Sequence, residues 1–438
     1  MMGAQSFAER TQEKPPPFWS NPASWIKEQN LGRGYWVFFF AAFFFDAGFS
    51  VYFFLFNLYL LDCGFNDRSI GLIGGALTLG SLVGTLPAGA LASKIGVRPL
   101  MAILFVAAPL VNSARVLWIW EPAQITLAFL TGLIMSAWGV CFLPAIARLT
   151  KESNRSSAFS LIFSASVGTS MLGGVICGYL RRWLGLMGIA MQAALVKELI
   201  LLVACALVLV GLFPVFRLRI PPEVHHQPAI DFSRQRGWSL RKWTPSPFLL
   251  RYLPLMALWS AVLAAFTPFA NIYLSRDLHV PMEHVGLVFS FAQGIQLCAG
   301  LLSPIVTRLL GLVKGIAVTQ AVAAVLLGCL GGARSGTFAI TLYLVYSAAQ
   351  WMSSPSLYNL LMNETPDRER SNAAAMTLFC NALVGSIATA GAGILFTRFG
   401  YPTVLLGLAA AGVSIALLFL IFIAPLLRTA PSNPTVNA

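Results

Sequence analysis

The sequence predicts an all-α membrane protein with twelve transmembrane helices in two pseudo-symmetric six-helix bundles. Of its 438 residues, 57% are hydrophobic and only 10% are charged, and the mean hydropathy is +0.76. This balance is outside the usual range of soluble domains. The hydrophobic residues form twelve runs that are long enough to cross a bilayer, and short motifs of the first half recur in the second half.

The first six hydrophobic runs each match the thickness of a bilayer. A hydrocarbon core of about 30 Å needs roughly 20 helical residues. The runs are continuous and rich in Gly, Ala, Leu and Phe, without the alternation of a barrel strand, so they are predicted as helices. They lie near residues 35–61, 69–91, 98–119, 123–147, 157–180 and 190–216. Together they form the predicted amino-terminal bundle, residues 35–216.

A polar segment at residues 217–249 separates the two sets of runs and is predicted as a linker. The carboxyl-terminal bundle is predicted to cover residues 250–426. Its six runs satisfy the same length criterion. They lie near residues 250–274, 282–309, 314–332, 338–361, 372–396 and 402–426.

The arginine and lysine residues predict the orientation. The amino-terminal segment, the loops after even-numbered spans and the carboxyl-terminal tail hold 21 of the 29, against 6 in the opposite loops. Because basic residues are retained in the cytoplasm, we expect both termini (residues 1–34 and 427–438) and the linker to be cytoplasmic. Asn21, Pro22 and Trp25 favour a short interfacial helix before the first span. The expected location is the cell membrane, inner or plasma.

Short motifs repeat between the two halves. Asn57 and Tyr59 recur in the second half as Asn271 and Tyr273, and Gly71 recurs as Gly286 at a shift that differs by a single position. Each match alone is weak. Because they occur at equivalent points of the topology, they indicate a duplicated six-helix bundle.

The loop after the second span contains Gly89, Ser93, Lys94, Gly96 and Arg98. It resembles the signature loop between the second and third helices of the major facilitator superfamily, although the signature usually has Asp where this chain has Ser93. With the two six-span halves and the basic linker, the resemblance covers residues from about 35 to 426. It implies a secondary transporter, a gating role for this loop, and a cavity lined by the first, fourth, seventh and tenth spans.

Proton-linked drug exporters of that superfamily tend to carry an Arg in the fourth span and a Gly-Pro pair in the fifth. Neither occurs in this sequence. Proton-coupled efflux therefore stays one option among several.

A polar stripe on the first span has a counterpart on the seventh. Polar groups are costly in lipid, so a stripe that occurs in both halves should face the interior. The helical spacing places its members on one face of each span. The candidates for the substrate cavity are Asp46, Ser50 and Asn57 on the first span and Ser260, Thr267 and Asn271 on the seventh.

Asp46 lies near the middle of its span. A carboxylate at that depth is expected to face water, to be protonated or to be paired, because its insertion costs roughly 2.5–3.5 kcal/mol. Asp46 is therefore the candidate for proton coupling. The alternative role, hydrogen bonding that only holds neighbouring helices together, stays open.

Further candidates for the cavity wall lie on the fourth, eighth and tenth spans. Aromatic walls with a few amides suit an organic solute of mixed polarity. Packing alone is the competing interpretation for the aromatic residues, whereas buried amides need partners. These candidates are Trp138, Gln293, Gln296, Tyr343, Tyr346 and Gln350.

Two charged residues of peripheral spans are expected to pair. Arg115 near the outer end of the third span and Glu198 in the outer part of the sixth lie at compatible depths. We expect a structural ion pair between them, rather than a role in transport.

Other classes of function find little support. The basic residues are scattered through short loops rather than gathered on one face, which argues against nucleic acid as a partner. No cysteine or histidine spacing indicates a metal, and no phosphate-binding loop is present, so no cofactor is expected. The expected partners are a small-molecule solute, protons as a candidate, and the lipid bilayer, with the chain a monomer. A transporter-like solute sensor and, less favoured, an intramembrane enzyme are the alternatives.

Overall fold

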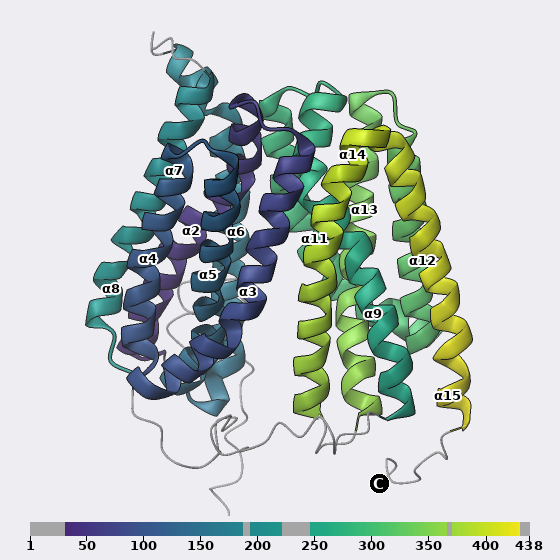
Figure 1. The fold of residues 1–438 in the computed structure, drawn as a ribbon. Coiled ribbons are helices and arrows are strands. Elements are labelled where there is room, and N and C mark those ends of the chain that lie inside the picture. Colours follow the sequence, from purple (N-terminus) through teal and green to yellow (C-terminus); the bar gives the residue numbers. More distant parts are fainter. Residues whose placement is uncertain (1–30, 187–192, 221–245, 366–369, 430–438) are drawn as a thin grey trace, which may run out of the picture.

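The computed structural model describes residues 31–186, 193–220, 246–365 and 370–429, which are predominantly helical and contain no strand. The predicted interfacial helix, most of the linker and most of the carboxyl-terminal tail lie outside this part of the chain. Figure 1 shows two groups of long helices side by side. The first group consists of α2 (Arg33–Asp62), α3 (Asp67–Ile95), α4 (Val97–Leu117), α5 (Glu121–Leu149), α6 (Glu152–Leu186), α7 (Ala193–Val210) and the short α8 (Leu212–Arg217).

The second group begins with a segment in which helix types alternate. It consists of α9 (Pro247–Phe266), the 3-10 turn η1 (Thr267–Phe269), α10 (Ala270–Ile272), the π-helical turn η2 (Tyr273–Asp277), α11 (Met282–Leu310), α12 (Leu312–Gly331), α13 (Gly336–Glu364), α14 (Arg370–Phe422) and α15 (Ala424–Thr429). The predicted seventh span is thus interrupted near its end. Pro268 lies at the interruption, where its missing N–H prevents a regular α-helical hydrogen bond.

Nine segments of the described chain are long and apolar enough to cross a membrane. One of them, Met376–Leu426, covers the last two predicted spans, and α14 changes direction within it at Gly400, whose φ is +74°. Helices α11 and α13 have 29 residues each but are not among the nine. For these two helices the spanning role remains a prediction.

The halves share local geometry at equivalent positions of the repeat. The turn between α3 and α4 has Gly96 at φ +89°, and the equivalent turn between α11 and α12 has Gly311 at φ +80°. Such angles favour glycine, which has no Cβ to clash. The Tyr59 hydroxyl donates to the carbonyl of Val116, and its repeat counterpart Tyr273 donates to Leu330. In each case 57 residues separate donor and acceptor.

The two halves meet closely along α3 with α14 and along α6 with α11. A Cβ built on Gly71 would lie 2.8 Å from the Cα of Gly393, and one on Gly174 would lie 2.7 Å from the carbonyl oxygen of Gly286. Only glycine permits backbones to approach so closely. These contacts lie toward the end of the molecule where α2 joins α3, called here the 62–67 end.

Candidate functional site: a cavity between the halves

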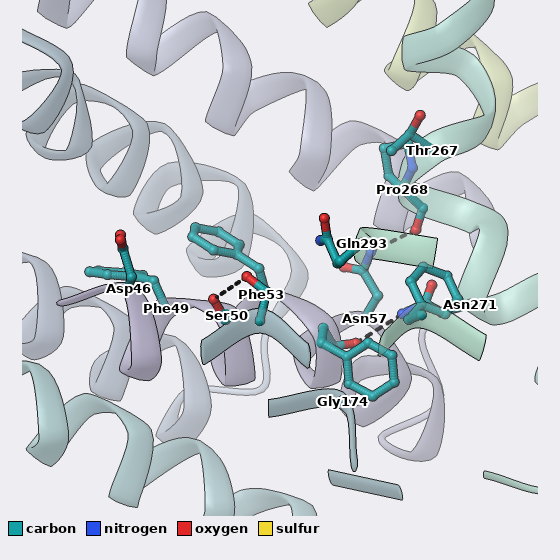
Figure 2. A pocket seen from close by; sticks show the side chains of 13 residues that line it. Asp46, Phe49, Ser50, Phe53, Asn57, Gly174, Thr267, Pro268, Asn271 and Gln293 are labelled. Carbon is teal, nitrogen blue, oxygen red and sulfur yellow. Dashed lines mark hydrogen bonds between the residues drawn. The ribbon is translucent and has the colours of Figure 1, made fainter. Parts of the chain in front are cut away.

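A cavity of about 330 Å³ lies between the two halves, next to the close contacts of the 62–67 end. Figure 2 shows side chains from both halves around it. Its volume lies at the lower end of the range of small-molecule sites, roughly 300–1,000 Å³. It is lined from α2 by Asp46, Phe49, Ser50, Phe53, Phe54 and Asn57, from α6 by Ser170 and Gly174, from η1 and α10 by Thr267, Pro268 and Asn271, and from α11 by Phe289 and Gln293.

The acidic group of the cavity is Asp46 on α2. It is the one acidic or basic side chain among the lining residues. The hydroxyl of Ser166 on α6 is its hydrogen-bond partner. Its neighbour Ser50 exchanges a hydrogen bond of 2.9 Å with Ser170 on α6. Serine side chains thus join α2 to α6 on the carboxylate side of the cavity, and no cation of the described chain neutralises Asp46.

Two asparagines bridge the halves at the other side of the cavity. The Asn57 amide donates to the carbonyl of Pro268 and the Asn271 amide donates to that of Phe54, both at 2.9 Å. The arrangement is reciprocal, because Asn271 is the repeat counterpart of Asn57 and Pro268 is the repeat counterpart of Phe54. We call these two bonds the asparagine bridge. They hold α2 against the interrupted seventh span, and Figure 2 shows both bonds beside the cavity.

Phenylalanine rings form much of the remaining wall. Phe49 and Phe53, one helical turn apart on α2, stack with their ring centroids 5.6 Å apart. Phe54 meets Phe289 of α11 edge to face at 5.4 Å. The cavity thus combines one carboxylate, a few amides and hydroxyls, and aromatic surface.

Only some of the cavity residues predicted from the sequence line this cavity. Of the predicted residues, Asp46, Ser50, Asn57, Thr267, Asn271 and Gln293 line the cavity, whereas Trp138, Ser260, Gln296, Tyr343, Tyr346 and Gln350 do not. The resemblance implied contributions from the fourth and tenth spans, which correspond to α5 and α13. In this structure α6 and α11 supply the wall in their place, because their glycines bring these helices together beside α2.

The predicted aromatic residues outside the cavity serve packing. Trp138 stacks on Phe45 inside the first half, with centroids 4.1 Å apart. Tyr343 is buried behind the cavity wall, 5.2 Å from Phe289, and Tyr346 packs edge to face on Phe266. These contacts match the packing alternative that the sequence left open.

Several lining residues were absent from the predicted set, namely Phe49, Phe53, Phe54, Ser170, Gly174, Pro268 and Phe289. The spacing of Phe49 and Phe53 with Asp46 on one helical face was a usable signal. Ser170 and Phe289 have no such signal, because their place depends on how closely α6 and α11 approach.

The expected ion pair between Arg115 and Glu198 does not form. The Arg115 guanidinium is buried over the ring of Phe56, 4.2 Å from its centroid, and its Nε and Nη1 atoms have no hydrogen-bond partner. Lys197 pairs instead with Asp62 at 2.8 Å. Asp62 lies at the last turn of α2, so its reach toward α7 depends on helix rotation, which the sequence does not specify.

The loop that resembles the family signature is well defined. Gly96 provides the positive φ of the turn, and Ser93 donates to the carbonyl of Ala90 at 2.8 Å. Arg98 donates to the carbonyl of Phe216 at the end of α8. The loop thereby joins the ends of α3, α4 and α8 within the first half.

The comparisons with known proteins agree with this architecture. The family model of the Major Facilitator Superfamily matches residues 38–389. The chain belongs to this superfamily. It is an integral membrane protein and a transporter of some solute. No curated protein matches its sequence.

Solved structures with the same fold are remote in sequence. The nucleoside transporter NupG, as a D323A mutant, aligns with a TM-score of 0.76 at 16% identity, covering 89% of this chain and 100% of that one. A bacterial homologue of the iron transporter ferroportin in an inward-facing state gives 0.69 at 16%, covering 89% and 98%. The xylose transporter XylE from E. coli, in an inward open conformation, gives 0.67 at 15%, covering 88% and 95%. At these identities the likeness concerns the fold.

Proposed function

We propose that this superfamily member moves a small organic solute across the cell membrane by alternating access, with the cavity between the halves as its binding site. The observation that carries the proposal is the lining itself: residues of both halves surround one volume, so a rocking motion of the halves would change the side from which it is reached. The NupG and XylE structures belong to transporters of nucleosides and of xylose, both small organic solutes.

The asparagine bridge and the glycine contacts join the halves nearer the 62–67 end than Asp46, which supports a cavity that is closed on that side. The basic-residue count favours the outer side of the membrane for that end. We therefore propose that this conformation faces the cytoplasm and that both termini are cytoplasmic. For the coupling and the direction of net transport, we propose proton-coupled efflux.

Asp46 is the proposed coupling group. Asp46 faces the cavity without a cationic partner. The protein passes through a closed state more readily when this carboxylate is neutralised, because an unpaired charge is costly in a closed, water-poor site. A proton supplies that neutralisation on one half of the cycle. The Ser166 hydroxyl can donate to the carboxylate or accept from the protonated carboxyl group, so it accommodates both forms.

The experiment uses purified protein in proteoliposomes. A metabolite and drug panel is first screened by ligand-induced thermal shift, and the stabilising solutes are then tested for transport with and without a pH gradient. We expect Asp46→Asn to abolish gradient-driven accumulation. The matched control is Asp62→Asn, because Asp62 lies on the same helix outside the cavity lining and should leave the gradient dependence intact. Unchanged gradient dependence in Asp46→Asn would remove Asp46 as the proton carrier, and no transport of any stabilising solute would refute the proposed function.

A further inference from the structure

Two carboxylates on α2 differ in their partners. Asp62 pairs with Lys197 at 2.8 Å, whereas Asp46, several turns earlier, faces the cavity with a serine hydroxyl as its hydrogen-bond partner. The lining contains no Lys, Arg or His. A carboxylate in a poorly solvated site is strongly stabilised by a cation and strongly destabilised by a second anion. The cavity therefore favours a positively charged solute and disfavours an anionic one.

Several hydrogen-bond donors of the cavity already have partners in the protein, and more acceptors than donors remain free. The Thr267 hydroxyl donates to the carbonyl of Leu263, and the amides of Asn57 and Asn271 donate to carbonyls across the halves. Acceptor capacity remains on Asp46 beyond its bond to Ser166, on the Asn57 amide oxygen and on the Thr267 hydroxyl, while the Gln293 amide offers both donors and an acceptor. A solute that carries N–H donors satisfies these groups, whereas a solute with acceptors alone leaves them unpaired.

The apolar part of the wall adjoins the carboxylate. Phe49 lies one turn after Asp46 and stacks on Phe53 in the following turn, so the carboxylate and the two rings share one face of α2 (Figure 2). Aromatic faces bind both aromatic bodies and ammonium groups. The volume of about 330 Å³ limits the solute to a small body.

From the unpaired carboxylate, the free acceptors and the stacked rings we propose that the cavity binds a small protonated amine with an aromatic or apolar body. Its ammonium group lies at Asp46 and its body lies along Phe49 and Phe53. This inference rests on the proposed function, whose site it specifies. It also supplies a reason for coupling, because the ammonium group and a proton neutralise the same carboxylate and cannot both occupy it.

The test compares matched triads that differ only in the end group. The probes are phenethylamine, phenethyl alcohol and phenylpropionate, and the larger set tryptamine, tryptophol and indolepropionate. Binding is measured by calorimetry on the full chain in detergent at neutral pH. We expect at least one amine to bind roughly tenfold to hundredfold more tightly than its alcohol, the range expected for a charge-assisted hydrogen bond, and the acids to bind most weakly.

Three variants assign the effect to Asp46. Asp46→Asn should reduce the advantage of the amine over the alcohol to near unity, whereas Asp46→Glu should retain part of it. Asp62→Asn should leave the advantage unchanged, since its carboxylate is outside the lining. Alcohol binding that is unchanged in Asp46→Asn reports that the cavity is still folded.

The inference is overturned if no amine binds better than its alcohol, or if the advantage persists in Asp46→Asn. A neutral or anionic solute from the wider panel that is transported while no amine binds would reject the amine class and leave the transporter function standing. Failure of the proposed function is a different result: no solute of any class is transported.

Discussion

Removal of the asparagine bridge should open the 62–67 end by a predictable amount. Asn57 and Asn271 each donate one hydrogen bond, to Pro268 and to Phe54, and both bonds join the two halves. A hydrogen bond of this kind contributes a net stabilisation of about 0.5–1.5 kcal/mol. If both bonds break when this end opens, one alanine substitution shifts the ratio of open to closed states about fivefold, and both shift it about thirtyfold.

The assay is the labelling rate of a cavity cysteine from the outer side. Gln293→Cys in a cysteine-free background reports access to the cavity, using a membrane-impermeant maleimide on right-side-out vesicles. Asn57→Ala should raise the rate about fivefold, and Asn57→Ala with Asn271→Ala about thirtyfold. Asn66→Ala is the matched control, because the Asn66 side chain caps α3 by accepting from the Ser69 amide within the same half. Equal labelling rates in the bridge variants, the control and the parent would refute the reasoning.

Two further predictions concern packing. Gly393→Val should raise outer-side labelling of the same reporter, because its Cβ would lie 2.9 Å from the Cα of Gly71. Gly391→Val is the control and should leave the rate unchanged, because no atom lies within 4 Å of its added Cβ. Equal labelling rates in the two variants would contradict the role of close glycine contacts. Arg115→Met should melt at the same or a higher temperature than the parent, because two guanidinium nitrogens are buried without partners, and its effect should add to that of Glu198→Gln. A combined effect that departs from the sum would indicate a direct pair with Glu198, and a clear fall in melting temperature for Arg115→Met would show that its contact with Phe56 outweighs the unpaired nitrogens.

The sequence predicted those parts of the site that follow from helical periodicity and duplication. Asp46, Ser50 and Asn57 share one face of α2 by spacing alone, and the repeat carried the same face to Thr267 and Asn271. All five line the cavity. The asparagine bridge was not predicted, but its reciprocal form follows from the repeat, because related halves with pseudo-twofold symmetry make reciprocal contacts.

The remaining parts depend on distances between segments that are far apart in the chain. Ser170 and Phe289 reach the cavity because Gly174 and Gly286 let α6 and α11 touch, and no local pattern states which helices approach so closely. The prediction for Trp138 as a cavity wall is not met in this structure for a related reason. An aromatic residue on a buried face fits packing as well as binding, and here Phe45 covers it.

The pairing of charges was the least predictable feature. Arg115 and Glu198 lie at compatible depths, but depth does not fix the rotation of a helix about its axis. The structure turns Arg115 toward Phe56 and joins Lys197 to Asp62. A side chain as long as arginine or lysine can reach several neighbours, so sequence position alone leaves the choice open.

Access to position 50, one helical turn from Asp46 in the cavity lining, tests the central claim most directly. In a cysteine-free background that keeps Asp46, Ser50→Cys is labelled with a membrane-impermeant maleimide, separately on inside-out and right-side-out vesicles. Alternating access with this conformation at rest predicts labelling from the cytoplasmic side and protection by a transported solute. A cysteine at this position that reacts from neither side, as a lipid-facing residue would, or that reacts with no protection by any transported solute, would contradict the account.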